Sequence, residues 1–476
     1  MPSPSESLAA RPRTSPTTPT GYAEIKIYAR ATRGRFERLR WLMLWITQAV
    51  FYGLPWLSWN GRQAVLFDLD AQRFYLFNLV LSPQDLVYLS VLLILCALGL
   101  FFVTTLAGRI WCGFACPQTV YTKLFMWVEL RTEGDRSARM RRDVGPWSME
   151  KVARKAAKQL LWVTISLWTG FSFVAYFTPL TTLALGGWSA WESFWVFFYA
   201  LMLYGNAGFL REQVCKHMCP YARFQSAMFD RDTLIIGYDS RRGDPRSARP
   251  RGPKAAALGQ GDCIDCTLCV QVCPTGIDIR DGLQSNCIGC AACIDACDDV
   301  MDKIGAPRGL VRYATQNAMD QGWGRRKMLA RLLRPRVLVY GALLLVLTAG
   351  LVIGLAARNP LKFDVIRDRG VQARIVEGGA VENVYRLHLT HTLERPQRYT
   401  IRVGGPQGLQ LSPDSPHSVR LEAAAERWLP LALSLPASQA VRLAGQNQPV
   451  EFHIQPEGST NPDASTTEAS RFIVPQ

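Results

Sequence analysis

The 476-residue sequence contains only five histidines and no cysteine after Cys297. Without cysteine, the last part of the chain cannot be stabilised by a disulfide. No G-x-G-x-x-G follows a recognisable strand, which excludes the usual dinucleotide-binding fingerprint. Acidic residues are also scarce: 38 Asp and Glu stand against 54 Lys and Arg, giving a net charge of +16. Such an excess is typical of proteins that bind nucleic acid or anionic membranes, and the positions of the charges distinguish the two.

Charge is absent from five apolar runs, each close to the roughly 20 residues that a membrane-spanning helix needs. We predict spans at Trp41–Trp59, Leu86–Gly108, Gln159 to about Leu180, about Trp191 to Leu210, and Val337–Ala357. Pro179 and the Gly186-Gly187 pair divide the long uncharged stretch into the third and fourth spans. Tryptophans near the span ends fit an aromatic belt. A soluble protein with five buried helices of this length is the weaker interpretation.

Basic residues gather after the second and fourth predicted spans, whereas the loop 60–85 carries little positive charge. The positive-inside rule therefore predicts that the N-terminus and both basic segments are cytoplasmic and that residues after Ala357 lie outside. Because this topology accounts for the charge, we expect a lipid bilayer and no nucleic acid as the partner. Residues 1–20 are rich in Pro, Ser and Thr and are expected to be disordered.

Eight of the thirteen cysteines form two copies of C-x2-C-x2-C-x3-C. This is the spacing of bacterial ferredoxins with two 4Fe–4S clusters, in which the fourth cysteine of each copy binds the other cluster. The predicted ligand sets are Cys263, Cys266, Cys269 and Cys297 for one cluster, and Cys287, Cys290, Cys293 and Cys273 for the other. Zinc sites use pairs with longer spacers, and disulfides need an oxidising compartment, so both are weaker alternatives. Asp298 stands where the pattern has a proline, which is not a ligand.

Four more cysteines form two Cys-x3-Cys-Pro pairs, Cys112 with Cys116 and Cys215 with Cys219. Each pair lies just past the cytoplasmic end of a predicted span. Because residues i and i+4 share one face of a helix, both thiols of a pair can face one acceptor, and the proline can end the helix. Soft thiolates select Cu(I) or iron–sulfur, so we predict one four-sulfur metal or redox site. Further candidate ligands there are His217 and Met218.

The alternative for these pairs is that they are reduced structural thiols, since a free cysteine packs as a small hydrophobic residue. Packing is also our expectation for the isolated Cys96 inside the second predicted span.

Short alternating stretches such as 384–389 and 450–454, separated by turn residues, predict an immunoglobulin-like β-sandwich at the C-terminus. Its histidines do not form a compact metal motif and are expected on the surface: His388, His391, His417 and His453. The predicted domains are a disordered, basic N-terminus at 1–38, four transmembrane helices with both Cys-x3-Cys-Pro pairs at 39–230, a cytoplasmic dicluster ferredoxin module at 231–334, a fifth transmembrane helix at 335–357, and a periplasmic sandwich at 358–476.

In this combination the chain resembles the family of the cytochrome c oxidase accessory protein CcoG, also called FixG or RdxA. The resemblance includes the segments RQAVLFDL at 62–69, CPQTV at 116–120 and QVCKHMCPYARFQ at 213–225. It implies a bacterial inner-membrane protein that reduces Cu(II) to Cu(I) on the cytoplasmic side for assembly of cbb3-type cytochrome oxidase. Copper would then be the substrate at the two Cys-x3-Cys-Pro pairs.

The resemblance also implies partners, namely copper carriers and the oxidase assembly machinery. Since the chain has no nucleotide site of its own, we expect a separate cytoplasmic electron donor. Two other functions remain open. One is a quinol-linked membrane electron conduit of the kind found beside periplasmic nitrate or nitrous oxide reductases. The other is a non-enzymatic assembly scaffold whose clusters sense oxygen.

Overall fold

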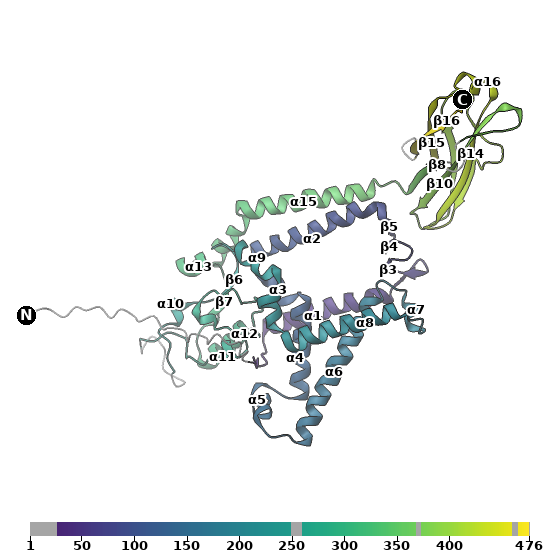
Figure 1. The fold of residues 1–476 in the computed structure, drawn as a ribbon. Coiled ribbons are helices and arrows are strands. Elements are labelled where there is room, and N and C mark those ends of the chain that lie inside the picture. The colour runs from purple at the N-terminus through teal and green to yellow at the C-terminus, as the bar shows by residue number, and fades with distance from the viewer. Residues whose placement is uncertain (1–25, 249–258, 368–372, 459–464, 476) are drawn as a thin grey trace, which may run out of the picture.

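The computed structural model describes residues 26–248, 259–367, 373–458 and 465–475. In Figure 1 the long helices occupy the middle of the molecule, with a cysteine-rich module at their left end and a β-sandwich at the upper right. The expected disorder of residues 1–20 falls outside the described ranges.

Five long helices overlap the predicted spans: α1 Arg35–Gly53, α2 Leu86–Ala107, α6 Met149–Val174, α8 Ala190–Leu203 and α15 Pro335–Ala356. Among the described residues, three helical segments are long and apolar enough to cross a membrane: Pro83–Ala107, Ala190–Leu210 and Pro335–Ala356. Helices α1 and α6 fall outside this group because each begins with charged turns, which leaves a shorter uncharged part. The number of five spans therefore stays a prediction, whereas three apolar helices indicate that the protein associates with a membrane.

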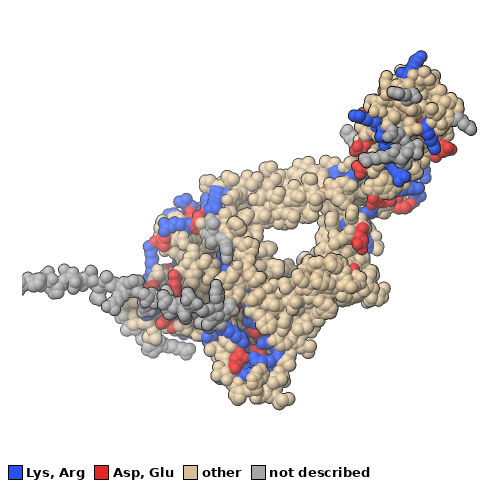
Figure 2. Space-filling view, in the orientation of Figure 1, with Lys and Arg blue, Asp and Glu red and all other residues tan. Residues whose placement is uncertain are grey.

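The long helices pack in pairs. Helices α2 and α15 run side by side in Figure 1, and Tyr88 Oη donates a hydrogen bond of 3.1 Å to the Gly354 carbonyl oxygen. Helices α6 and α8 approach closely because Gly170 lacks a side chain, and a Cβ there would lie 2.4 Å from the Val196 carbonyl oxygen. Figure 2 shows that the visible surface of the long helices is largely free of charge. The expectation that Cys96 is packed is wrong, because the apolar part of α2 buries none of its residues and leaves this thiol exposed.

The segment between α1 and α2 forms two small antiparallel sheets. Their strands are β1 Ser58–Trp59, β2 Arg62–Gln63, β3 Val65–Asp68, β4 Arg73–Leu76 and β5 Leu79–Leu81. We expect the first span to reach Trp59, but α1 ends at Gly53, because a 3-10 turn containing Pro55 follows it. Trp59 therefore belongs to β1 and not to the helix.

Ion pairs join this end of the helices to the sandwich. Arg62 of β2 pairs with Glu394, which lies in the sandwich. The Asp85 carboxylate, only 2% exposed, pairs with Arg358 at 3.1 Å and also with Lys362. A buried carboxylate needs such partners, so these contacts tie the start of α2 to the end of α15 and the first sandwich strand.

The basic segment between α2 and α6 folds into helices: α3 Ile110–Phe114, α4 Pro117–Thr132 and α5 Arg136–Val144. At its centre the Glu129 carboxylate, 3% exposed, accepts hydrogen bonds of 2.6 Å from both Arg139 and Arg211. Because removing either partner would leave a buried charge uncompensated, this network holds α4, α5 and the end of the fourth predicted span together.

The N-terminal residues 26–34 lie in an extended segment before α1. Asp295 of the cysteine-rich module caps α1, accepting hydrogen bonds from the amides of Phe36 at 3.1 Å and Glu37 at 2.7 Å. A carboxylate at this position satisfies free amides and interacts favourably with the helix dipole. These contacts order part of the N-terminus, which we expect to be disordered over residues 1–38.

The cysteine-rich module is built around a two-stranded antiparallel sheet. Its elements are β6 Ile235–Tyr238, α10 Ser240–Gly243, α11 Leu268–Gln271, η6 Ile279–Asp281, α12 Ala292–Ile304, β7 Val311–Ala314, α13 Gln316–Gln321, α14 Arg325–Ala330 and η7 Arg331–Leu333. Strand β6 pairs with β7, so residues far apart in the chain close the module around its cysteines.

The C-terminal part is a sandwich of two sheets with strand orders β12-β14-β10-β8 and β13-β11-β15-β16, and β9 pairs with β10. Its elements are β8 Leu361–Arg367, β9 Arg374–Ile375, η8 Glu377–Gly379, β10 Val381–His391, β11 Gln397–Gly404, β12 Gln410–Leu411, β13 Ser418–Leu421, β14 Glu426–Leu435, α16 Ala437–Arg442, β15 Asn447–Pro456 and β16 Thr466–Ile473. Alternate residues of β10, such as Tyr385, Leu387 and Leu389, fill the core. The predicted immunoglobulin-like sandwich is confirmed.

The prediction that all four sandwich histidines lie on the surface is wrong for His391. This side chain is 1% exposed, because its position in β10 faces the core, where its ring packs against Tyr399. Its Nδ1 atom lies 3.1 Å from the Glu422 carbonyl oxygen. The four histidines do not converge on one another within the part of the chain that the structure describes.

Candidate functional site

The cysteine-rich module contains two cavities, each lined by four of the motif cysteines. Cys263, Cys266, Cys269 and Cys297 line one small cavity, and Cys273, Cys287, Cys290 and Cys293 line a second small cavity that Cys269 also touches. Within α12, Cys297 lies one turn beyond Cys293, so successive turns of the same helix contribute to the two cavities. Each repeat therefore supplies three cysteines to one cavity and its fourth cysteine to the other.

The backbone bends in the same way around both cavities. On either side of the second cysteine of each repeat, φ is positive: 50° at Asp265 and 55° at Thr267, 67° at Gly289 and 61° at Ala291. For a residue other than glycine, this left-handed conformation costs roughly 1–2 kcal/mol. Such strain persists where the surrounding structure fixes it, often at binding sites. The sequence repeat is thus also a repeat of an unusual backbone conformation.

Two side chains outside the cysteine motifs brace these loops. Tyr313 Oη donates a hydrogen bond of 2.6 Å to the Gly289 carbonyl oxygen. Asp298 takes the place of the proline in the usual pattern, and its Oδ1 accepts a hydrogen bond of 2.9 Å from the Gly309 amide. The carboxylate therefore gives the end of the second motif a contact that proline cannot make.

The cysteine side chains fit an iron–sulfur cluster better than a single ion. Burial, followed by crowding with other cysteines, raises the pKa of Cys287 and of Cys297 to about 12. Bound iron offsets that cost because it holds the sulfurs as thiolates. No three Cys, His, Asp or Glu side chains among the described residues lie close enough to bind one metal ion. Four sulfurs spaced around a cavity suit a four-iron cluster, whereas structural zinc needs them at one tetrahedral centre.

The two Cys-x3-Cys-Pro pairs share one local structure. Cys112 lies in α3 and Cys116 is the N-cap of α4, while Cys215 lies in the π-helical turn η4 (Val214–Met218) and Cys219 is the N-cap of α9 (Pro220–Met228). The expectation that both thiols of a pair lie on one helix is wrong. The proline is the first residue of a new helix, a position at which its missing amide hydrogen costs nothing.

Both pairs come together beside the second cavity. Cys112 and Cys215 pack against the buried cluster of side chains around Cys290. The contact extends to the backbone, since a Cβ on Gly113 would lie 2.7 Å from the Gly289 carbonyl oxygen. Burial raises the pKa of Cys112 to about 12 and that of Cys215 to about 11, and cysteines of both pairs add to each shift. Cys112 and Cys215 therefore lie against the second cavity, with Cys116 and Cys219 near enough to influence their charge, and we call these four residues the thiol quartet.

A buried arginine lies beside the thiol quartet. Arg109 immediately precedes α3, is 7% exposed, and donates a hydrogen bond of 2.5 Å to the Ala222 carbonyl oxygen. Its positive charge acts on Cys112, Cys215 and Cys287, favouring their thiolate forms against the effect of burial. In the sequence, Arg109 is one charge of the basic segment that follows the second predicted span. Its position three residues before Cys112 was the available signal.

Met218 is 59% exposed and His217 is also exposed, so their role as further ligands stays a prediction. The quartet is also not a ready-made site for a single ion, because no three metal-binding side chains converge closely among the described residues. Copper binding at the four sulfurs would therefore require their side chains to move together.

Three family models match the chain. A 4Fe–4S dicluster domain matches residues 210–316, which include Cys215, Cys219 and all eight cysteines of the repeat. A second model, a 4Fe–4S binding domain, matches residues 89–132 and includes Cys112 and Cys116. The immunoglobulin-like fold at the C-terminus of FixG, described as a putative oxidoreductase, matches residues 351–475.

Relatives match most of the chain. The nitrogen fixation protein FixG of Rhizobium meliloti is 40% identical over 80% of this chain and 79% of its own. Protein RdxB of Cereibacter sphaeroides is 39% identical over 84% of this chain and 87% of its own. Protein RdxA of the same organism is 37% identical over 90% of this chain and 92% of its own. The chain therefore belongs to the FixG/RdxA family of 4Fe–4S electron-transfer proteins.

Proposed function

We propose that the protein reduces Cu(II) to Cu(I) at the thiol quartet for the assembly of cbb3-type cytochrome c oxidase. The observation that carries this proposal is the position of the quartet, which lies against the cavity lined by Cys273, Cys287, Cys290 and Cys293. A one-electron acceptor bound by these thiols would sit beside a one-electron carrier. The family resemblance supports copper as that acceptor.

The two cavities would each hold one 4Fe–4S cluster. Cys263, Cys266, Cys269 and Cys297 form one ligand set, and Cys273, Cys287, Cys290 and Cys293 form the other. When bound, each cluster takes up and gives back one electron at a time. The chain itself buries or half-buries all of these cysteines except the exposed Cys266, braces the loops and brings the second cavity against α3.

The thiol quartet suits the reduced form of copper. Thiolates bind Cu(I) in preference to harder metal ions, so four sulfurs at the electron-transfer site favour reduction of bound Cu(II) by one electron. Because burial raises the pKa of Cys112 and Cys215, these thiols are protonated at neutral pH, and copper binding releases their protons. The positive charge of Arg109 favours the release of the Cys112 proton, since it stabilises the thiolate form.

The positions of the basic residues support a bacterial inner-membrane protein with the cysteine-rich module in the cytoplasm and the sandwich in the periplasm. In this arrangement α1 and α6 join the three apolar helices as spans. Electrons come from a separate cytoplasmic donor, and copper carriers and the oxidase assembly machinery receive the product.

Two alternatives make different predictions. A quinol-linked conduit would oxidise quinol and pass its electrons to a protein acceptor without reducing free copper. A non-enzymatic scaffold would support oxidase assembly after the cluster cysteines are replaced. The thiol quartet favours copper reduction over the scaffold, because a protein that only docks other subunits does not need four thiols near one another.

The test is anaerobic Cu(II) reduction by the purified full chain, followed with a Cu(I)-specific chelator. Cys112→Ser and Cys215→Ser should each abolish most of the rate while iron and acid-labile sulfide stay at the level of the unsubstituted protein. Cys96→Ser is the matched control, because that thiol is exposed on α2. Wild-type rates in both quartet variants would contradict the proposal.

A further inference from the structure

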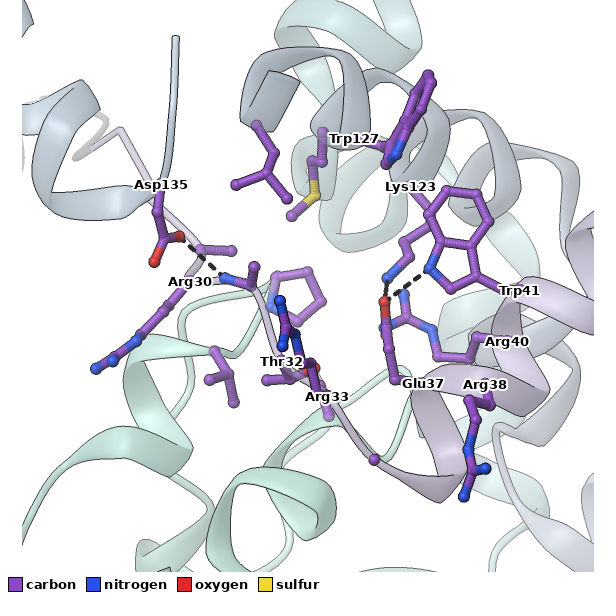
Figure 3. Close-up of a pocket in the computed structure, with 18 of the residues that line it drawn as sticks. Arg30, Thr32, Arg33, Glu37, Arg38, Arg40, Trp41, Lys123, Trp127 and Asp135 are labelled. Carbon is purple, nitrogen blue, oxygen red and sulfur yellow. Dashed lines mark hydrogen bonds and ion pairs between the residues drawn. The ribbon is translucent and has the colours of Figure 1, made fainter. Parts of the chain in front are cut away.

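A large basic cavity lies between the N-terminal segment, helices α1 and α4, and the cysteine-rich module. It measures about 930 Å³ and is closed on one side by Val272, Pro274 and Ala292, which flank cysteines of the second cavity. Figure 3 shows Arg33 reaching toward its centre, with Lys123 and Trp41 on the other side. We call it the basic cavity. Neither the clusters nor the thiol quartet uses it.

The basic cavity carries more positive charge than its own residues neutralise. Six basic and two acidic side chains line it: Arg30, Arg33, Arg38, Arg40, Lys123, Arg139, Glu37 and Asp135. Glu37 is shared by Arg40 and Lys123, and Arg139 pairs with Glu129 outside the cavity. Arg30, Arg33 and Arg38 are exposed, and their guanidinium groups have no hydrogen bond or ion pair to any described residue. Arg33 reaches toward the centre of the cavity, whereas the Arg30 and Arg38 guanidinium groups point outward at its mouth, and within the described residues all three remain available to an anion.

The other wall of the basic cavity is apolar and continues onto exposed helix surface. Trp41, Trp127 and Leu130 line it, and the latter two are 38% and 36% exposed. Directly beyond, α1 exposes Leu42 at 55% and Trp45 at 62%. Tryptophan beside arginine is typical of the membrane–water boundary. A ligand that fills the cavity can thus be charged at one end and apolar at the other.

We propose that the basic cavity binds the phosphate headgroup of an anionic membrane lipid, with its acyl chains along α1. Basic pockets between membrane helices on the cytoplasmic side are suited to such headgroups. The free guanidinium groups match phosphate because they form charge-assisted, often bidentate hydrogen bonds. The exposed apolar strip of α1 gives the chains a surface that inorganic phosphate would not use.

This site would brace the module against the membrane. The N-terminal segment is already attached to the module through the hydrogen bond from the Arg30 amide to the Gln271 carbonyl oxygen, 2.9 Å, and α1 is capped by Asp295. A phosphate held by Arg33, with the outward-pointing Arg38 side chain turned toward it, would join the same two parts to the bilayer. The lipid site rests on the membrane topology given with the proposed function but needs neither copper nor bound clusters, so a failure of copper reduction would leave it unaffected.

The experiment measures binding of phosphatidylglycerol to the full chain in neutral detergent by native mass spectrometry. Phosphatidylcholine and inorganic phosphate are titrated in parallel. The test variant is Arg33→Gln with Arg38→Gln, and the matched control is Arg35→Gln with Arg141→Gln, two exposed arginines outside the cavity. Because each arginine near the membrane surface contributes about 1 kcal/mol to binding an anionic lipid, we expect the test variant to bind about thirtyfold more weakly.

The control should retain the affinity of the unsubstituted protein, and phosphatidylcholine should bind weakly to every form. Equal losses in both variants would overturn the inference, since the effect would then be a general one of surface charge. Equal binding of phosphatidylcholine, or full displacement of phosphatidylglycerol by inorganic phosphate, would overturn the assignment to a lipid. Thermal unfolding midpoints that agree between the two variants exclude misfolding as the cause.

Discussion

Gly113→Ala tests whether α3 must lie directly against the loop of the second cavity. The added Cβ would lie 2.7 Å from the Gly289 carbonyl oxygen and 2.8 Å from the Cys290 Cα atom. Since an ordinary contact needs at least 3.4 Å, α3 would have to retreat by about 0.7 Å. Overpacking of this kind costs about 1–3 kcal/mol. The retreat carries the neighbouring Cys112 sulfur away from the cavity.

We expect Gly113→Ala to lower the rate of Cu(II) reduction by about tenfold or more, because a misplacement of about 1 Å at a reacting centre can cost a hundredfold. The assay is Cu(I)-chelator formation by the anaerobic full chain, with iron measured in the same sample. Gly99→Ala is the control, since a Cβ there meets nothing within 4 Å. An unchanged rate in Gly113→Ala would refute the reasoning, and so would a loss of iron that matches the loss of rate.

Three further results are expected. Asp295→Ala should destabilise the chain by about 0.5–2 kcal/mol in thermal unfolding, because it removes the cap of α1. Replacement of the exposed Asp299 by alanine is the control and should leave the unfolding midpoint unchanged. Equal unfolding midpoints for the two variants would contradict the role of Asp295 as a cap. Cys273→Ser should remove about half of the iron found by elemental analysis, and a full complement would show that this cysteine is not a ligand. Burial lowers the pKa of His391 below its usual 6.5, so the unfolded chain takes up a proton that the folded chain resists. Chemical denaturation should therefore show stability falling as the pH drops below 6.5, and His391→Gln should flatten that slope.

Patterns that depend on neighbouring residues could be predicted from the sequence. The alternation in β10 follows from one buried face, so the sandwich was predictable without its partner strands. The three apolar helices follow from composition alone. The cysteine spacing also predicts which cysteines share a cavity, because the first three cysteines of each repeat surround one cluster and the fourth binds the other.

Contacts between distant segments could not be predicted in this way. Asp295 caps α1 by accepting a hydrogen bond from the amide of Phe36, 259 residues earlier, and nothing in either segment specifies the other. The approach of Gly113 to Gly289 depends on how the module docks on the helices. His391 lies on the same face of β10 as the core residue Leu389, but the Glu422 carbonyl oxygen beside its Nδ1 comes from another part of the chain. Tertiary packing decides each of these positions.

The most direct test of the central claim is the iron and acid-labile sulfide content of the anaerobically purified full chain, measured with its electron paramagnetic resonance spectrum. We expect about eight iron atoms and eight sulfides per chain, with the signals of two neighbouring 4Fe–4S clusters on reduction. Zinc in place of iron, or iron without acid-labile sulfide, would contradict it.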